Sequence, residues 1–92
     1  MKPGGMNMNV DTKNVTDLMA SVANDSTVPR NIRLALDEAR KKLQEKDLDV
    51  GITGAIYLLD DISNDINMPS HTRTEIWQII SELESIREKI KK

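Results

Sequence analysis

A string of residues that occurs twice constrains the fold more than any other feature of the chain. Residues 24–33 read NDSTVPRNIR and residues 64–73 read NDINMPSHTR, so Asn, Asp, Pro and Arg recur 40 positions apart. Self-similarity at a fixed period of roughly 20–50 residues indicates a helical unit that is used more than once. We therefore expect two similar halves, each a hairpin of two helices.

Apolar residues recur with a helical period in four segments, and no segment has the alternation of a strand. The expected helices cover 11–24, 29–46, 48–63 and 69–90, and residues 1–10 form a flexible N-terminal tail. Only a short charged link separates the second and third helices, which favours antiparallel neighbours. We predict that residues 11–92 form an all-α four-helix bundle made of two similar hairpins. A two-unit HEAT-like repeat is the alternative.

The repeated string is suited to end one helix and begin the next. Its asparagine can adopt the left-handed conformation that ends a helix, and its proline fits the first turn of a new one. The apolar residue before each proline, Val28 or Met68, is expected to lie beneath the turn. The aspartate sits near a helix start, where negative charge is favourable, and the arginine is within reach of it. We expect a structural role in the two turns for Asn24, Asp25, Pro29, Arg33, Asn64, Asp65, Pro69 and Arg73.

Gly51 and Gly54 interrupt the third expected helix. A glycine in a helix interior costs ~1 kcal/mol relative to alanine, so a compensating reason is expected. Either a neighbouring helix approaches closely at these residues, or the first turn of the third helix is flexible. The sequence leaves both interpretations open.

Composition narrows the chemistry available to this chain. Its 92 residues include no cysteine, which excludes disulfides, thiolate zinc sites and thiol catalysis. The formal net charge of −2 gives no overall basic field for nucleic acid. No apolar run approaches the roughly 18 residues that span a bilayer. We expect a cytoplasmic protein with no membrane partner, and the sequence implies no small-molecule ligand.

Two groups of polar residues resemble parts of metal or catalytic sites. Asp61, Ser63, Asp65 and Asn67 have the spacing of the first ligands of a calcium loop. However, Ile66 replaces the glycine that the loop requires, and Thr72 stands where its bidentate glutamate belongs. His71 is the only histidine, so it cannot form a typical zinc site. We therefore expect neither an enzyme nor a protein with a metal or cofactor.

Two helix surfaces remain as candidates for binding. The second expected helix carries a basic face opposite its apolar stripe, suited to an anionic partner: Arg30, Arg33, Arg40 and Lys41. Asp37 lies within that arc and dilutes its charge. The fourth expected helix has more apolar positions than a narrow stripe needs. Its candidate protein interface comprises Trp77, Ile80, Ile86 and Ile90.

Three segments carry a likeness to a known family: 27–33, 55–65 and 68–77. In these segments the chain resembles a family of short, all-helical, uncharacterised archaeal proteins. The resemblance implies a bromodomain-like four-helix bundle, an archaeal cytoplasm and no assigned activity. Ile66 stands where family members often have proline, a departure that concerns only the turn.

The expected function follows from an excess of apolar surface and an absence of catalytic groups. We predict a non-enzymatic helical module that binds another protein, or a second copy as a homodimer, through the third and fourth helices. The alternative is an RNA- or ribosome-associated protein that uses the basic face of the second helix. A hydrolase would require Asp60, Asp61 and Asp65 to converge in a cleft.

Overall fold

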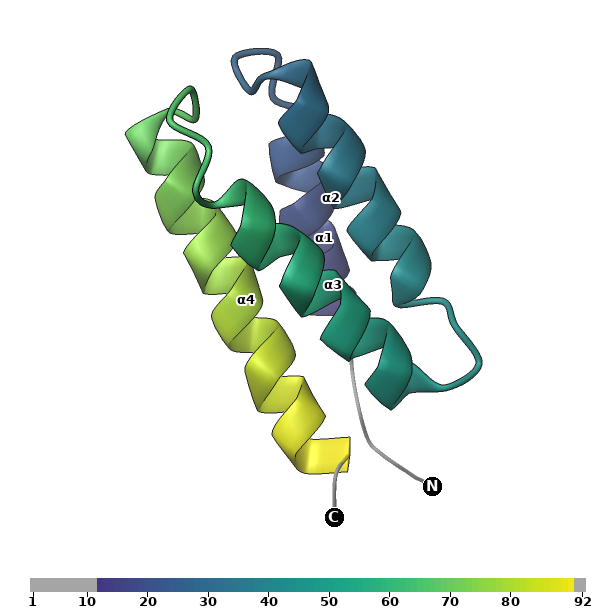
Figure 1. The fold of residues 1–92 in the computed structure, drawn as a ribbon. Coiled ribbons are helices and arrows are strands. Elements are labelled where there is room, and N and C mark those ends of the chain that lie inside the picture. Colours follow the sequence, from purple (N-terminus) through teal and green to yellow (C-terminus); the bar gives the residue numbers. More distant parts are fainter. Residues whose placement is uncertain (1–11, 91–92) are drawn as a thin grey trace.

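The computed structural model describes residues 12–90, and these form four α-helices joined by short connections (Figure 1). The helices are α1 (Lys13–Ala23), α2 (Arg30–Lys42), α3 (Leu48–Ile62) and α4 (Ser70–Ile90). No strand occurs in this part of the chain, as the apolar period predicts. The expected tail at 1–10 lies outside the described residues.

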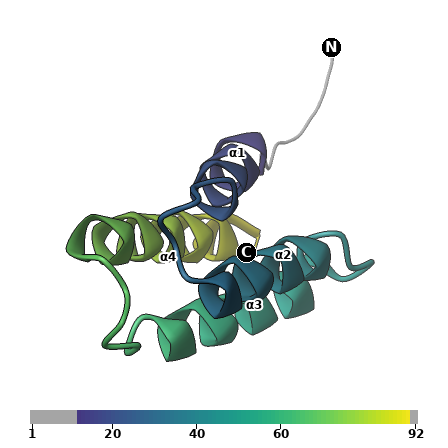
Figure 2. The same ribbon diagram turned by 90° about the horizontal axis from the view of Figure 1, so that it is seen from above.

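The four helices close into a ring. Each helix packs on the next one in the sequence, and α4 packs on α1. Figure 1 shows α4, α3 and α2 side by side with α1 behind them, and Figure 2 gives the same arrangement from above. A repeat of two stacked HEAT-like units would not bring the first and last helices together. The predicted four-helix bundle is therefore confirmed.

An aliphatic core fills the space inside the ring. Each helix buries one stripe, and the buried apolar residues of the helices are Val15, Met19, Val22, Ile32, Leu36, Ala39, Ile52, Ala55, Ile56, Leu59, Ile76, Ile79, Leu83 and Ile86. Val28 and Met68 are also buried, which confirms their expected place beneath the repeated turns. A fully buried side chain of this kind contributes about 1.5–3 kcal/mol, so these stripes hold the bundle together. In residues 12–90, no helix is both long and apolar enough to cross a membrane.

Two expectations about helix ends are wrong. Asn24 caps α1 with φ −90° and ψ −3°, a right-handed conformation rather than a left-handed one. The chain turns instead at Asp25, whose carboxylate accepts a hydrogen bond from the backbone N–H of Thr27 at 2.9 Å. Helix α2 ends at Lys42 and not at residue 46, because the backbone N–H groups of Gln44 and Glu45 bond to carbonyls only three residues back.

The two glycines of α3 mark a close approach to α2. A Cβ atom on Gly51 would overlap the backbone carbonyl oxygen of Lys42. A Cβ atom on Gly54 would lie 3.0 Å from Cδ of the Lys42 side chain, which runs across this glycine. Of the two interpretations that the sequence left open, a close helix contact is the one that the structure supports.

Candidate functional site

The repeated turns lie together at one end of the bundle, opposite the α2–α3 link (Figure 1). In each turn the aspartate accepts a hydrogen bond from the backbone two residues on, Asp25 from Thr27 at 2.9 Å and Asp65 from Asn67 at 2.8 Å. The Thr27 hydroxyl also donates to Asp25 at 2.7 Å. These bonds favour the charged carboxylate, and the Thr27 side chain is the largest cause of the lowered pKa of Asp25.

Each turn is also tied to the other hairpin. Asn31, in the first turn of α2, donates from Nδ2 to Asp65 Oδ2 at 2.9 Å. His71, in the first turn of α4, places Nε2 3.8 Å from Asp25 Oδ2. We call two positions equivalent when they are 40 residues apart in the sequence, as residues 31 and 71 are. The Asn31 hydrogen bond is the largest cause of the lowered pKa of Asp65. The two aspartates therefore link the hairpins.

The two arginines of the repeat differ in their contacts. Arg73 donates from Nε to the backbone oxygen of Ser63 at 3.1 Å and from Nη2 to that of Asp65 at 2.8 Å. It thus caps the end of α3 and reaches the Asp65 backbone rather than its carboxylate. Arg33 has a buried Nε with no hydrogen-bond partner. Of the two arginines, Arg73 is the one that hydrogen-bonds to the backbone of its own turn.

The acidic residues near the second turn are exposed to solvent or bonded within the turns. Asp60 and Asp61 are exposed side chains at the end of α3, and Asp65 is engaged with Asn31 and Asn67. Among the described residues, no three His, Cys, Asp or Glu side chains converge in a way that would hold a metal ion.

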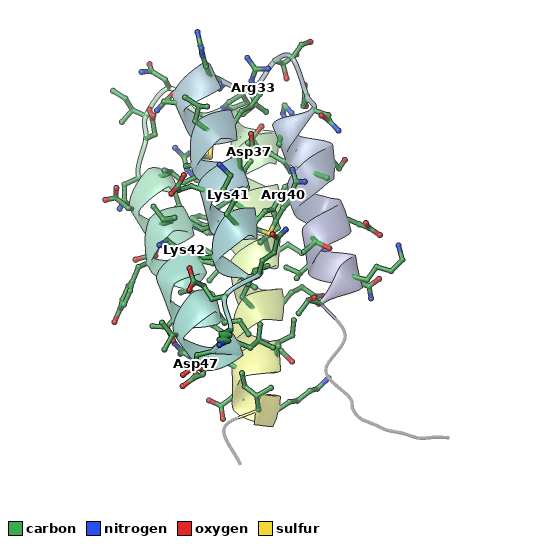
Figure 3. The ribbon with its side chains drawn as sticks, turned by 90° about the vertical axis from the view of Figure 1, so that its right-hand side faces the viewer. Arg33, Asp37, Arg40, Lys41, Lys42 and Asp47 are labelled. Atoms are coloured by element: carbon green, nitrogen blue, oxygen red, sulfur yellow. The ribbon has the colours of Figure 1, made fainter. Side chains whose placement is uncertain are left out.

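The predicted basic face lies along α2 (Figure 3). Arg33, Asp37 and Arg40 follow one another down the helix, with Lys41 beside them. Asp37 accepts a hydrogen bond from Arg40 Nη1 at 3.1 Å, so this carboxylate neutralises the centre of the face. Arg30 and Lys41 are exposed, and Arg33 is half-buried. The face offers separated cations rather than a continuous basic strip.

The predicted apolar interface on α4 is mostly part of the core. Ile86 is only 7% exposed, and Ile80 and Ile90 are partly buried side chains packed against the core. Trp77, at 55% exposed, is the one residue of the four that a partner can reach readily. The isoleucines are covered because α3 and α1 pack on both sides of α4.

Several apolar side chains that the sequence did not suggest as binding residues are also exposed to solvent. Tyr57 is 72% exposed on α3, and Ile66 is 90% exposed in the second turn. Val50 and Leu34 are exposed as well, on α3 and α2. The exposure of one pair could have been predicted from the sequence. Val50 and Tyr57 are seven residues apart, which places both on the side of α3 opposite its buried stripe. Together with Trp77, these residues place most of the exposed apolar surface on the second hairpin.

Equivalent positions provide an internal comparison. Residues 24–41 and 64–81 have the same classes of exposure at every position. The exposed Trp77 is equivalent to the exposed Asp37, Ile66 to Ser26, and Tyr57 to Asp17. The first hairpin thus carries a polar residue wherever the second carries one of these three apolar ones. Folding alone does not require apolar side chains at such positions.

Comparison with known proteins identifies relatives across most of the chain. The model of an uncharacterised protein family, UPF0147, matches residues 4–86. A UPF0147 protein of Methanothermobacter thermautotrophicus is 46% identical over 91 residues, which cover 96% of this chain and 89% of the relative. A UPF0147 protein of Methanocaldococcus jannaschii is 47% identical, and the match covers 82% of this chain and 83% of that protein.

Solved structures show the same fold. The crystal structure of the unknown function protein MMP1188 has a TM-score of 0.78 at 46% identity, covering 84% of this chain and 94% of that one. A structure from Thermoplasma acidophilum, from the same uncharacterised family, has a TM-score of 0.77 at 34% identity, covering 80% and 89%. The resemblance to archaeal all-helical proteins is confirmed, and the chain belongs to the UPF0147 family.

Proposed function

We propose that this chain is a non-enzymatic module that binds another protein through the outer surface of its second hairpin. The binding residues are Tyr57, Ile66 and Trp77, which we call the apolar surface. A single observation carries this proposal. At the equivalent positions, which are also exposed, the first hairpin has Asp17, Ser26 and Asp37.

The chemistry of the apolar surface suits protein recognition. Tryptophan and tyrosine are enriched among the residues that dominate binding energy, because each removes a large rigid area from water. Burial of one such side chain contributes about 1.5–3 kcal/mol. The aromatic side chains of this protein, Tyr57 and Trp77, both lie on this surface. The first hairpin, which lacks them, serves as a control within the same molecule.

Exchange of residues between equivalent positions tests the proposal. The double variant Tyr57→Asp/Trp77→Asp copies what the first hairpin carries at those positions, so it should fold with unchanged helicity. Proteins captured from lysate by the wild type, or self-association measured by analytical ultracentrifugation, should be lost in this variant. The matched control is Leu34→Thr. It replaces an exposed apolar residue of α2 with the residue at the equivalent position of the second hairpin, Thr74. A double variant that captures and associates like the wild type would refute the proposal.

The basic face of α2 supports a second candidate function, binding of an anionic partner such as RNA. The observation in its favour is the pair Arg30 and Lys41, two exposed cations of α2 that form no ion pair within residues 12–90. Binding to cellular RNA should then weaken with rising salt and after Arg30→Glu or Lys41→Glu. Binding that is absent, or unchanged by salt and by these variants, would dismiss this candidate.

We also propose that the two hairpins derive from one duplicated unit and that the protein acts in the cytoplasm. The repeated string and the matching exposure of 24–41 and 64–81 support the duplication. The resemblance to uncharacterised archaeal proteins supports the location. Fractionation of cells followed by immunoblotting would test the location, and recovery mainly with membranes would contradict it.

A further inference from the structure

An open groove runs between α1 and α4. Its lining residues are Asn14, Asp17, Leu18, Ser21 and Glu82, and its volume is about 390 Å³. Leu18 is partly buried against the core and supplies an apolar floor. The groove therefore combines an apolar floor with a carboxylate from each of the two helices.

At the equivalent place between α2 and α3, a lysine side chain lies across α3. Lys42 is equivalent to Glu82, and Gly54 is equivalent to Asn14. The Lys42 atoms Cδ, Cε and Nζ lie 3.0, 3.5 and 3.8 Å from where a Cβ on Gly54 would stand. The arm of the lysine thus lies along α3. Between α4 and α1 the corresponding side chain is a shorter, oppositely charged glutamate, and the space stays open.

The carboxylates of the groove are available to a cation. Glu82 is exposed and makes no ion pair within residues 12–90. Asp17 Oδ2 lies 3.4 Å from Lys13 Nζ. The Lys13 side chain is 76% exposed and the Asp17 side chain 67% exposed. Exposed pairs of this kind are weak, so a second cation can compete for the aspartate.

We propose that the α1–α4 groove receives a lysine side chain from a basic segment of a partner protein. The methylene arm lies on Leu18, as the Lys42 arm lies on α3, and the ammonium group lies between Asp17 and Glu82. Lysine suits such a place because its long apolar stem packs while its charged end stays at the solvent boundary. This groove shares no residue with the apolar surface and does not depend on it.

A peptide titration tests the groove directly. The probe is an acetylated, amidated alanine peptide with lysine at every fourth position, and the same peptide with glutamine in place of lysine is its control. At low ionic strength, the lysine peptide should cause saturable changes in the amide NMR signals of Leu18, Ser21 and Glu82. The glutamine peptide should cause none.

Matched variants separate the groove from general charge attraction. Asp17→Asn/Glu82→Gln should weaken binding about three- to tenfold, from the loss of two exposed charge contacts. Asp60→Asn/Asp61→Asn removes the same number of charges elsewhere and should change affinity less than twofold. Asn14→Phe keeps every carboxylate but fills the groove, and should abolish the saturable changes.

Several results would overturn the proposal. These are absence of saturable binding by the wild type, equal weakening by the two double variants, and binding that persists in Asn14→Phe. Self-association that Asp17→Asn/Glu82→Gln abolishes would assign the groove to a second copy of this chain instead. Amide spectra of each variant with the dispersion of the wild type ensure that a loss of binding reflects the groove and not misfolding.

Discussion

At the scale of single residues, equivalent positions of 24–41 and 64–81 have the same class of exposure but make different contacts. Arg73 caps the end of α3, whereas Arg33 does not complete its turn. Asn31 and His71 both face the opposite aspartate, one as a neutral donor at 2.9 Å and one as an imidazole at 3.8 Å. The contacts of Asn31 and His71, which occur in both halves, therefore hold the hairpins together. The contrast between Arg33 and Arg73 shows that the two turns are not identical.

The glycines of α3 give the first prediction. Gly51→Ala should destabilise the protein, because the new methyl group would overlap the backbone oxygen of Lys42, which cannot move independently of α2. Overpacking of this kind costs about 1–3 kcal/mol, more than the ~1 kcal/mol that alanine contributes through helix propensity. Gly54→Ala meets only the flexible Lys42 arm, so it should be neutral or stabilising. Urea denaturation of both variants measures the contrast, and equal effects would contradict it.

The contact between Asn31 and Asp65 gives a prediction about pH. Its hydrogen bond lowers the pKa of Asp65 in the folded protein below the ordinary value of 3.8. A group with a lowered folded pKa stabilises the protein above its unfolded pKa, and this contribution is lost as pH falls through the folded value. Asn31→Ala should therefore raise the pKa of Asp65 in an NMR titration of its carboxyl carbon. The variant should be less stable than the wild type at pH 7 but not at pH 2.

The same titration contains its own control. Asp25 has a lowered pKa that depends chiefly on Thr27 and not on Asn31. Its pKa should stay unchanged in Asn31→Ala. If the pKa values of both aspartates rise together, the two turns respond as one unit and the assignment to this single hydrogen bond is wrong.

At the scale of elements, helix ends depend on side-chain caps and on neighbouring helices. Asp47 caps α3 by accepting hydrogen bonds from the backbone N–H groups of Asp49 and Val50 at 3.1 and 3.4 Å. Asp47→Ala should destabilise the protein by about 0.5–2 kcal/mol, because a capping side chain satisfies N–H groups that have no partner in the helix. Denaturant unfolding measures this loss. Asp49→Ala removes a nearby charge without the cap, and a loss as large as that of Asp47→Ala would contradict the capping role.

Local patterns predicted the helices well because each one buries a continuous stripe with the helical period. They did not predict the end of α2, because the hydrogen bonds from Gln44 and Glu45 to carbonyls three residues back, which end it, leave no mark in the apolar period. They also selected Ile80, Ile86 and Ile90 as an interface, because the number of neighbours that cover a helix cannot be counted from its own period. Tyr57 was missed although its spacing from Val50 places it opposite the buried stripe of α3. An exposed apolar residue is common, and this one becomes notable when it is compared with Asp17 at the equivalent position.

At the scale of the whole molecule, the closed ring makes the two hairpins one cooperative unit. The buried residues form a single cluster to which all four helices contribute, and two contacts at the turns, Asn31 with Asp65 and His71 with Asp25, cross between hairpins. Separate hairpins would expose most of this cluster to water. Thermal unfolding followed by circular dichroism should therefore show one transition, with the same midpoint as the fluorescence of Trp77, which reports on α4 alone. Two different midpoints would mean that α4 and the total helix content are lost at different temperatures. The hairpins would then fold independently, and the contact between α4 and α1 would add little to stability.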